Sequence, residues 1–421
     1  MTPALHSPVG RILPRHASSL VQEALADTRV VLVNGARQSG KSTLVIQVSG
    51  RTSEWRSLDR PSIRRAAEAD PTTFVREEGM LVIDEVQRVP ELLLAIKEVV
   101  DLDTRPGRFL LTGSARLLSL RSIPDALPGR METIELWPLS QGEIDERPDG
   151  FVDAVFELGP ELRHQSALDR NSYIDRIVRG GFPEAIARTG RRREAFFDNY
   201  IADLVNRDVI QISEIERVPE LRTLISMLAA QSGQLLVPGT LASRLGLPQS
   251  TVSRYLALLE EVFLIKRIPA WSRNLSARAV STAKIALVDS GIAANLLGQD
   301  ALGLRRPDSQ IGGLLEGFVA MEIARQLTWS RTRAELFHYR TKDKVEVDLV
   351  LEDRRGRAVA IEVKASATVR AEDFKGINHL ETRLGDDLIA GIVFYTGSET
   401  LSFGHKKRAV PISALWELGV D

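Results

Sequence analysis

The sequence contains no cysteine among its 421 residues. A disulfide framework and a thiolate-ligated metal site are therefore excluded. Proteins without disulfides are typical of reducing compartments, so we expect a cytoplasmic protein.

Long apolar runs are also lacking. No stretch approaches the roughly 20 apolar residues that a membrane-spanning helix needs. The opening MTPALHSPVGRILPRH lacks the apolar centre of a secretory signal. We therefore expect no membrane partner. Hydrophobic residues make up 43% and charged residues 26% of the chain, a balance that is typical of globular proteins.

A strong excess of one charge is missing too. The formal net charge is −1, so no global field attracts nucleic acid, and any contact with DNA or RNA must come from a local patch. The basic residues are ten lysines and 45 arginines. A lysine inside a motif is therefore harder to explain by chance.

The first 145 residues alternate apolar strands with helical stretches. Apolar runs occupy 29–34, 80–84 and 108–112, and helical patterns begin at Lys41 and span 90–100. Continuous apolar strands alternating with helices predict a parallel sheet that is covered on both faces.

The later segments change pattern several times. Segment 151–218 is mostly helical with a break at GGFP (180–183), and a helix at 310–328 precedes strands near 335–340, 345–351, 357–364 and 388–397. We expect an α/β protein with these parts: a nucleotide-binding domain at 1–150, a helical lid or linker at 151–218, a winged-helix domain at 219–270, a connector at 271–309 and a C-terminal α/β domain at 310–421.

Residues 35–42, GARQSGKS, fulfil the pattern G-x-x-x-x-G-K-[ST] directly after an apolar strand. Gly35 and Gly40 permit a loop whose N–H groups face phosphates, and the following helix adds its positive end. Lys41 would reach the β- and γ-phosphates, and Ser42 would bind Mg²⁺. The ATP-binding residues that we expect are Gly35, Ala36, Arg37, Gln38, Ser39, Gly40, Lys41, Ser42 and Thr43.

A second motif, LVIDE at 81–85, is an apolar strand that ends in two acids. Asp84 would hold Mg²⁺, and Glu85 would polarise the attacking water. An Asp-Glu pair alone more often consists of acids that cap a helix or lie in a loop. Behind a complete phosphate-binding loop, it predicts that Mg-ATP is bound and hydrolysed.

Residues 240–260, TLASRLGLPQSTVSRYLALLE, match a helix-turn-helix, and the following VFLIKRI supplies a strand for a wing. The second helix would offer polar residues to a DNA groove: Gln249, Ser250, Thr251, Ser253 and Arg254. With only one arginine on this face, packing or protein contact is an equally open interpretation.

Charged residues share one face of two C-terminal strands. Asp348 lies in VEVDLVLE, while Glu362 and Lys364 lie in AVAIEVKAS after an expected hairpin at DRRG. This D…E-x-K order is that of the PD-(D/E)xK nucleases, in which Asp348 and Glu362 would bind a second divalent metal and Lys364 would position water. Glu316, or else Glu322, could complete that site. A solvated strand face with a cross-strand salt bridge is the alternative.

The order of these motifs resembles the bacterial and archaeal AAA+-type ATPases that join a P-loop domain to a C-terminal restriction-endonuclease-like domain. The resemblance covers nearly the whole chain and implies Mg-ATP binding, a homo-oligomer and a nuclease-like C-terminal module. Its carriers are GARQSGKSTL, LVIDEVQRVP, LLTGSARLL, LPGRMETIELWPLS, GGFPEA, YIADLVNRDV, the winged-helix stretch, LLEGFVAMEI, EVDLVL and IEVKAS.

The resemblance also implies two further catalytic roles. A sensor 1 residue belongs at the end of the third strand, where we choose Ser114 over Thr112 and Arg116. Arg130 in ALPGR is the candidate arginine finger, acting across a subunit boundary, although an ordinary surface arginine is an equal alternative.

Two functions remain open. The first is an ATPase that acts on nucleic acid, most simply DNA, through a C-terminal domain that binds or cuts it. The second is a nucleotide-dependent switch or scaffold whose C-terminal domain serves only assembly or protein contact, which the near-neutral charge favours. The acid pair of LVIDE and the polar third strand disfavour a small-molecule kinase.

Overall fold

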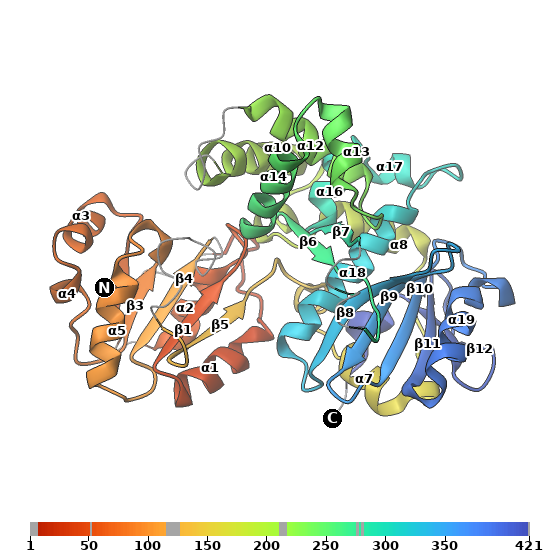
Figure 1. Ribbon diagram of the computed structural model, residues 1–421, viewed down its shortest axis with the longest axis horizontal. Helices are drawn as coiled ribbons and strands as arrows, with labels where there is room; N and C mark the ends of the chain where they lie inside the picture. Colours follow the sequence, from red (N-terminus) through yellow and green to blue (C-terminus); the bar gives the residue numbers. More distant parts are fainter. Residues whose placement is uncertain are drawn as a thin grey trace. The chain divides into compact units, whose positions relative to one another are not determined.

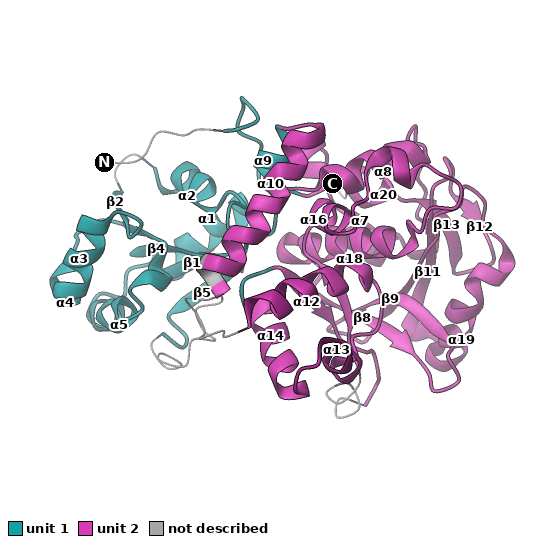
Figure 2. Ribbon diagram, turned by 90° about the horizontal axis from the view of Figure 1, so that it is seen from above, with its two compact units in different colours: residues 1–139, 182–187, 261–263 teal, residues 140–181, 188–260, 264–421 magenta. Residues whose placement is uncertain are grey.

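The computed structural model describes residues 7–50, 53–114, 127–209, 217–274, 278 and 282–419. Figures 1 and 2 show two compact units, which we describe separately. Unit 1 comprises residues 1–139, 182–187 and 261–263, and unit 2 comprises residues 140–181, 188–260 and 264–421.

Unit 1 is built on a five-stranded parallel sheet with the order β2-β3-β4-β1-β5. Its elements are α1 (Ala17–Asp27), β1 (Val30–Asn34), α2 (Lys41–Ser49), β2 (Glu54–Ser57), α3 (Pro61–Ala69), α4 (Pro71–Phe74), β3 (Leu81–Asp84), α5 (Leu92–Leu102), β4 (Phe109–Gly113), β5 (Met131–Glu135) and α9 (Pro183–Ile186). The three strands that the apolar runs predict are confirmed as β1, β3 and β4.

Helices cover both faces of this sheet. Val31 and Val33 of β1 pack in one cluster with residues of α1 and α2, while Val30 and Leu32 pack in another with α5. Alternation along a strand sends neighbouring side chains to opposite faces, and both faces are buried here. The unit is therefore a three-layer α/β/α structure.

The first half of unit 2 is mostly helical. It contains α6 (Gln141–Asp145), α7 (Phe151–Leu158), α8 (Arg170–Arg179), α10 (Gly190–Asp203), a π-helix (Leu204–Val209), α12 (Val218–Ala230), α13 (Pro238–Leu245), α14 (Gln249–Glu261), β6 (Ile265–Ile268), β7 (Lys284–Leu287), α16 (Ser290–Leu296) and α17 (Ala301–Leu304). The expected winged-helix segment 219–270 contains the helices α12, α13 and α14, and α8 ends just before Gly180, which has a φ of 68°.

The second half of unit 2 carries a six-stranded mixed sheet with the order β12-β13-β11-β10-β9-β8. Its elements are α18 (Gly312–Trp329), β8 (Ala334–Arg340), β9 (Glu346–Asp353), β10 (Ala358–Val363), α19 (Lys375–Leu384), β11 (Leu388–Tyr395), β12 (Leu401–Ser402), β13 (Lys407–Pro411) and α20 (Ala414–Glu417). The DRRG turn joins β9 to β10 as an antiparallel pair, which confirms the expected hairpin. Ile377 and Leu380 of α19 pack against the apolar side chains of this sheet.

The first continuous part of unit 1 ends at Leu139, and residues 140–150 belong to unit 2. Within the segment 271–309, strand β7 pairs antiparallel with β6. No helix in the described part of the chain is long and apolar enough to cross a membrane.

Candidate functional site

The loop between β1 and α2 has the geometry of a phosphate-binding loop. A Cβ at Gly35 would lie 2.0 Å from the Leu136 carbonyl oxygen, so no larger residue fits, and Gly40 begins α2 with a φ of 97°. Lys41 is 4% exposed, and its Nζ donates to the carbonyl oxygens of Gly35 (3.0 Å) and Ala36 (2.9 Å). The ammonium therefore faces the interior of the loop.

The rest of the loop is tightly held. Gln38 takes a left-handed conformation with a φ of 60°, Ser39 is fully buried, and its hydroxyl has no hydrogen-bond partner among the described residues. Arg37, inside the loop, and Thr43, in the first turn of α2, are half-buried.

Arg15, which the sequence did not single out, braces this loop. Its guanidinium donates to the carbonyl oxygens of Ser39 and Trp137, each at 2.7 Å. The arginine precedes the first predicted strand and lies in no recognisable motif. One side chain thus ties the loop to the segment that follows β5.

Asp84 at the end of β3 collects three hydroxyl groups. Ser42 donates to its Oδ1 at 3.0 Å, Thr112 to the same oxygen at 2.7 Å, and Ser57 to Oδ2 at 3.2 Å. Burial raises the pKa of Asp84, against the lowering effect of these hydrogen bonds and with a further rise from the charge of Glu85. A cation beside this carboxylate would favour its ionised form.

Glu85 occupies a left-handed backbone conformation, with a φ of 60°. Its amide donates to the Thr112 hydroxyl at 2.9 Å, and its carboxylate accepts from Ser114 at 2.8 Å and from Gln87. Gln87 also donates to the Ser114 hydroxyl at 2.7 Å. The structure thus joins Glu85 to the predicted Ser114 and adds Gln87, which sequence reasoning missed; Arg116 lies outside the described residues.

The donor set fits Mg-ATP. Strand β4 lies between β1 and β3, so Thr112 at its carboxyl end stands between the phosphate-binding loop and the acid pair. A buried lysine, an unpartnered buried hydroxyl and a hydroxyl–carboxylate pair are the groups that phosphates and a hard cation need. Lys41 would contact phosphate, and Ser42 and Asp84 would hold Mg²⁺.

Arg130 lies away from the loop of its own chain. It precedes β5 at the amino ends of the strands, whereas the loop follows the carboxyl end of β1, about 15 Å along a five-residue strand. Arg130 forms an ion pair with Asp101. An action as arginine finger would therefore concern the nucleotide of another subunit.

Charged residues of the C-terminal sheet also come together. Asp348 on β9 accepts a hydrogen bond from the Val363 amide at 3.0 Å, and Lys364 lies 3.3 Å from Glu362. Glu316 on α18 lies nearby, as does Glu346, and the side chain of Lys284 lies between them. We call Glu316, Glu346, Asp348 and Glu362 the acidic cluster.

Burial changes the acid strength of this cluster. Burial, followed by the charge of Asp348, raises the pKa of Glu316 and of Glu362, whereas the ammonium groups of Lys284 and Lys364 favour the ionised forms of these two acids. The described residues contain no group of three or more His, Asp or Glu arranged to hold a metal ion. The expected second metal therefore has no support in the arrangement of these side chains.

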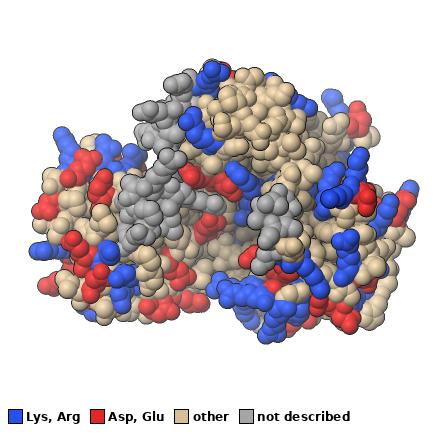
Figure 3. Space-filling model, viewed as in Figure 1, with Lys and Arg blue, Asp and Glu red and all other residues tan. Residues whose placement is uncertain are grey.

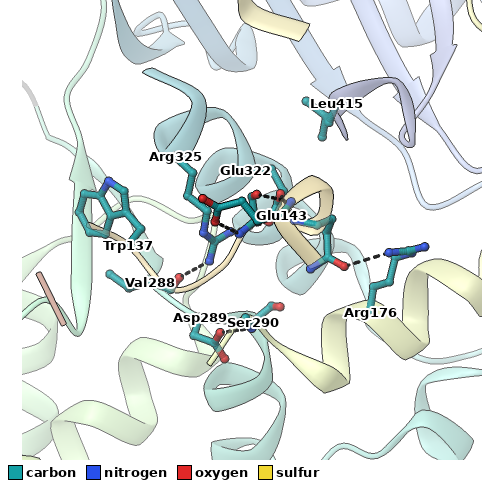
Figure 4. Close-up of polar contacts among 12 residues, drawn as sticks. Trp137, Glu143, Arg176, Val288, Asp289, Ser290, Glu322, Arg325 and Leu415 are labelled. Atoms are coloured by element: carbon teal, nitrogen blue, oxygen red, sulfur yellow. Dashed lines mark hydrogen bonds and ion pairs between the residues drawn. The ribbon is translucent and has the colours of Figure 1, made fainter. Parts of the chain in front are cut away.

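Glu322, the other acid considered for that site, is engaged elsewhere. It is fully buried, pairs with Arg325 and accepts a hydrogen bond from the Gln141 amide at 2.9 Å. Figure 4 shows Arg325 between Glu322 and Val288, whose carbonyl oxygen accepts its second hydrogen bond at 3.0 Å. Glu322 is thus part of a buried polar network and does not join the acidic cluster.

The second helix of the helix-turn-helix, α14, has one apolar and one polar face. Val252, Tyr255, Leu256 and Leu259 are buried, whereas the predicted DNA-facing residues Gln249, Ser250, Ser253 and Arg254 are exposed and Thr251 is half-buried. The buried residues recur every three or four positions, so they lie on one face of the helix and the exposed polar residues lie on the other.

Family models match three parts of the chain. A model described as an AAA domain matches residues 27–145, and two models described as domains of unknown function, DUF8612 and DUF4143, match residues 170–303 and 311–415. The first of these agrees with the site geometry. None of the three describes the C-terminal part as nuclease-like.

Curated relatives match over most of the chain. The uncharacterized proteins Rv2008c of Mycobacterium tuberculosis and Mb2031c of Mycobacterium bovis are each 31% identical over 360 residues, which cover 84% of this chain and 74% of each relative. An uncharacterized protein of Haemophilus influenzae is 24% identical over 322 residues, covering 70% of this chain and 74% of that relative.

Solved structures give weaker likenesses. A Signal Transduction ATPase with Numerous Domains from Pyrococcus horikoshii is 11% identical with a TM-score of 0.26, over 78% of this chain and 48% of that chain. A RuvB variant of Thermotoga maritima is 21% identical with a TM-score of 0.28, over 60% and 87%.

Proposed function

This chain, whose N-terminal unit carries an AAA-type ATPase domain, belongs to the family of the mycobacterial proteins Rv2008c and Mb2031c, and we propose that it hydrolyses Mg-ATP to drive a cycle of nucleic-acid binding by unit 2. The observation that carries the ATPase half is the hydrogen-bonded set of Ser42, Asp84 and Thr112 beside a buried Lys41.

Each residue has a definite part in the proposed hydrolysis. Lys41 would neutralise phosphate charge, and Mg²⁺, when bound, would supply further positive charge to the phosphates. Glu85 is the base: its carboxylate, oriented by Ser114 and Gln87, would accept a proton from the attacking water. Ser42 and Asp84 would hold the cation.

Two exposed features of unit 2 support nucleic acid as the partner. The polar face of α14 is one. The other is an arginine cluster: Arg331, Arg333, Arg354 and Arg355 are exposed, and the Arg354 amide donates to the Arg333 carbonyl at 3.3 Å, which brings the two loops together. Figure 3 shows Lys and Arg side chains gathered below β8 and β9.

The arginine cluster suits phosphates. Asp353, in the same turn, forms an ion pair with Arg357 at 2.8 Å and accepts hydrogen bonds from the backbone amides of Arg355 and Arg357. Within the described part of the chain, the four guanidinium groups of the cluster form no ion pair. Exposed cations that lack acidic partners are the usual contacts to a phosphate backbone.

The ATPase proposal is tested by phosphate release from wild-type protein, Lys41→Ala and Glu85→Gln. Lys41→Ala should lose tight ATP binding. Glu85→Gln should keep ATP binding and lose turnover by at least about a hundredfold, since it removes the base. Normal turnover in Glu85→Gln would remove Glu85 from the mechanism.

Coupling is tested by adding single- and double-stranded DNA and RNA to the same assay. Stimulation by one of them supports the proposed cycle. ATP turnover that no nucleic acid changes would still support the ATPase activity and would favour a nucleotide-dependent switch that acts on a protein.

Homo-oligomerisation, which Arg130 would need in order to act as arginine finger, is tested by mixing Arg130→Ala with Glu85→Gln subunits. Restored turnover would indicate that the active sites are shared between subunits.

A further inference from the structure

We propose that Lys284 is the resident cation of the acidic cluster, and that the C-terminal domain therefore does not bind the divalent metal ion that its D…E-x-K pattern implies. The acidic cluster belongs to unit 2, whereas the residues of the ATP site belong to unit 1.

The geometry of Lys284 carries the proposal. Its side chain is 1% exposed, and its Nζ lies 2.6 Å from Glu316 Oε1, 3.0 Å from Glu346 Oε1 and 3.4 Å from Asp348 Oδ1. An ammonium group has three protons to donate, and three carboxylates from α18 and β9 converge on it. The cluster is therefore arranged around a positive charge that the chain itself supplies.

A divalent ion would compete for the same oxygens. Mg²⁺ and Ca²⁺ need carboxylate oxygens at about 2.0–2.6 Å, and the Lys284 ammonium in their midst would repel a second cation. The remaining groups are also engaged: the second oxygen of Asp348 accepts from the Val363 amide, and Glu362 pairs with Lys364. The carboxylates of the cluster are thus already paired with the ammonium groups of Lys284 and Lys364.

The lysine comes from a different part of the chain than the acids. Lys284 begins β7, pairs through its backbone with Ile268 of β6 and forms a β-bridge with Leu235. The acids lie on α18, β9 and β10, beyond residue 311. Lys284 thus ties the helix-turn-helix module to the C-terminal sheet by charge. Removing one partner of a buried ion pair is strongly destabilising, so this tie also constrains the fold.

The electrostatics of the lysine agree with this role. Burial alone would lower the pKa of Lys284, but the surrounding carboxylates, Glu316 first and then Asp348, outweigh burial and raise it. The ammonium therefore keeps its charge at neutral pH. On this basis the C-terminal sheet of unit 2 serves binding and assembly, and metal-dependent cutting of nucleic acid is not among its activities.

The test is Mn²⁺ binding to full-length, nucleotide-free protein, followed by the loss of the free-ion EPR signal. Wild type, Lys284→Met, Asp348→Asn and the double variant are compared, and Lys342→Met, an exposed lysine of the neighbouring turn, is the matched control. We expect Lys284→Met to gain one Mn²⁺ site that Asp348→Asn removes. Wild type and Lys342→Met should show no binding that depends on Asp348.

A second readout is thermal unfolding. Lys284→Met should unfold at a lower temperature than wild type, and millimolar Mn²⁺ should restore part of the loss in this variant alone. Mn²⁺ binding by wild type that Asp348→Asn abolishes would overturn the proposal, as would a folded Lys284→Met that binds no Mn²⁺. If Lys284→Met does not fold, the wild-type and Asp348→Asn pair still decides between the two outcomes.

Discussion

Glu85 owes its position to one unusual backbone conformation. A non-glycine residue in the left-handed region is uncommon, and here it turns the chain away from β3 so that the carboxylate meets Ser114 and Gln87. The amide bond to Thr112 holds the turn in place. The base of the proposed reaction is thus positioned by Thr112 on β4, by Ser114 directly after this strand and by Gln87, two positions along the chain.

Replacing Gln87 with alanine should slow ATP turnover without weakening ATP binding. The variant removes one of the two side chains that orient the Glu85 carboxylate, and a misplaced base can cost up to about a hundredfold in rate. Steady-state phosphate release and nucleotide titration measure the two effects separately. Gln47→Ala, an exposed glutamine on α2, is the control; equal rates in both variants would refute the role of Gln87.

His338 predicts a pH dependence of stability. It is 1% exposed, and burial lowers its pKa to about 4, against the hydrogen bond to the Thr282 carbonyl at 3.0 Å. The unfolded chain therefore binds a proton that the folded chain refuses between pH 6.5 and 4. Because neutral His338 is compatible with the fold, its effect on stability is most favourable above pH 6.5. Between pH 6.5 and pH 4 the free energy of unfolding decreases as the pH falls, by up to about 1.4 kcal/mol per pH unit.

The matched variant for this prediction is His338→Gln, which keeps an amide donor for Thr282 and does not titrate. Urea unfolding of both proteins at pH 7 and pH 5 gives two differences in free energy. Wild type should lose more stability between the two pH values than His338→Gln. Parallel losses would show that His338 is protonated in the folded state.

At the scale of the element, burial decides what the sequence can reveal. The central strands β1, β3 and β4 are buried on both faces, so each is a continuous apolar run and was predicted. The outer strands β2 (EWRS) and β5 (METIE) are partly exposed and carry charged residues. They therefore form no continuous apolar run, and the sequence pattern did not predict them. The same holds for side chains: Lys41 and Asp84 lie in motifs, whereas Arg15 and Lys284 act through contacts between distant segments that no local pattern records.

Asp289 joins two elements of unit 2. Its buried carboxylate caps α16 through the Ile292 amide at 3.0 Å and accepts from the Gly181 amide at 2.6 Å. Asp289→Ala should lower the free energy of unfolding by about 2–4 kcal/mol, because a cap is lost and two buried amides are left unpaired.

The control for this prediction is Asp300→Ala. Asp300 caps α17 through the Gly303 amide at 2.7 Å, but it is exposed, so water can replace it. Its loss should cost only about 0.5–1 kcal/mol. Urea unfolding that gives the same cost for both variants would argue against a junction at Asp289.

At the scale of the whole molecule, the net charge of −1 makes salt dependence informative. In a protein without a global basic excess, contacts to the phosphates of DNA or RNA must come from local groups such as the arginine cluster, so affinity should fall with log salt by about 0.7–0.9 per phosphate contacted. Replacing Arg331, Arg333, Arg354 and Arg355 by glutamine should reduce that slope by about 3. Fluorescence anisotropy at several salt concentrations measures it, and an unchanged slope would place the contact elsewhere.

The two units share one chain in an interleaved way. Unit 1 is completed by residues 182–187 and 261–263, which follow long stretches of unit 2. No single cut in the chain therefore separates all of unit 1 from all of unit 2, and one recombination breakpoint could not exchange the whole of unit 1. The arrangement favours inheritance of the two units as one piece.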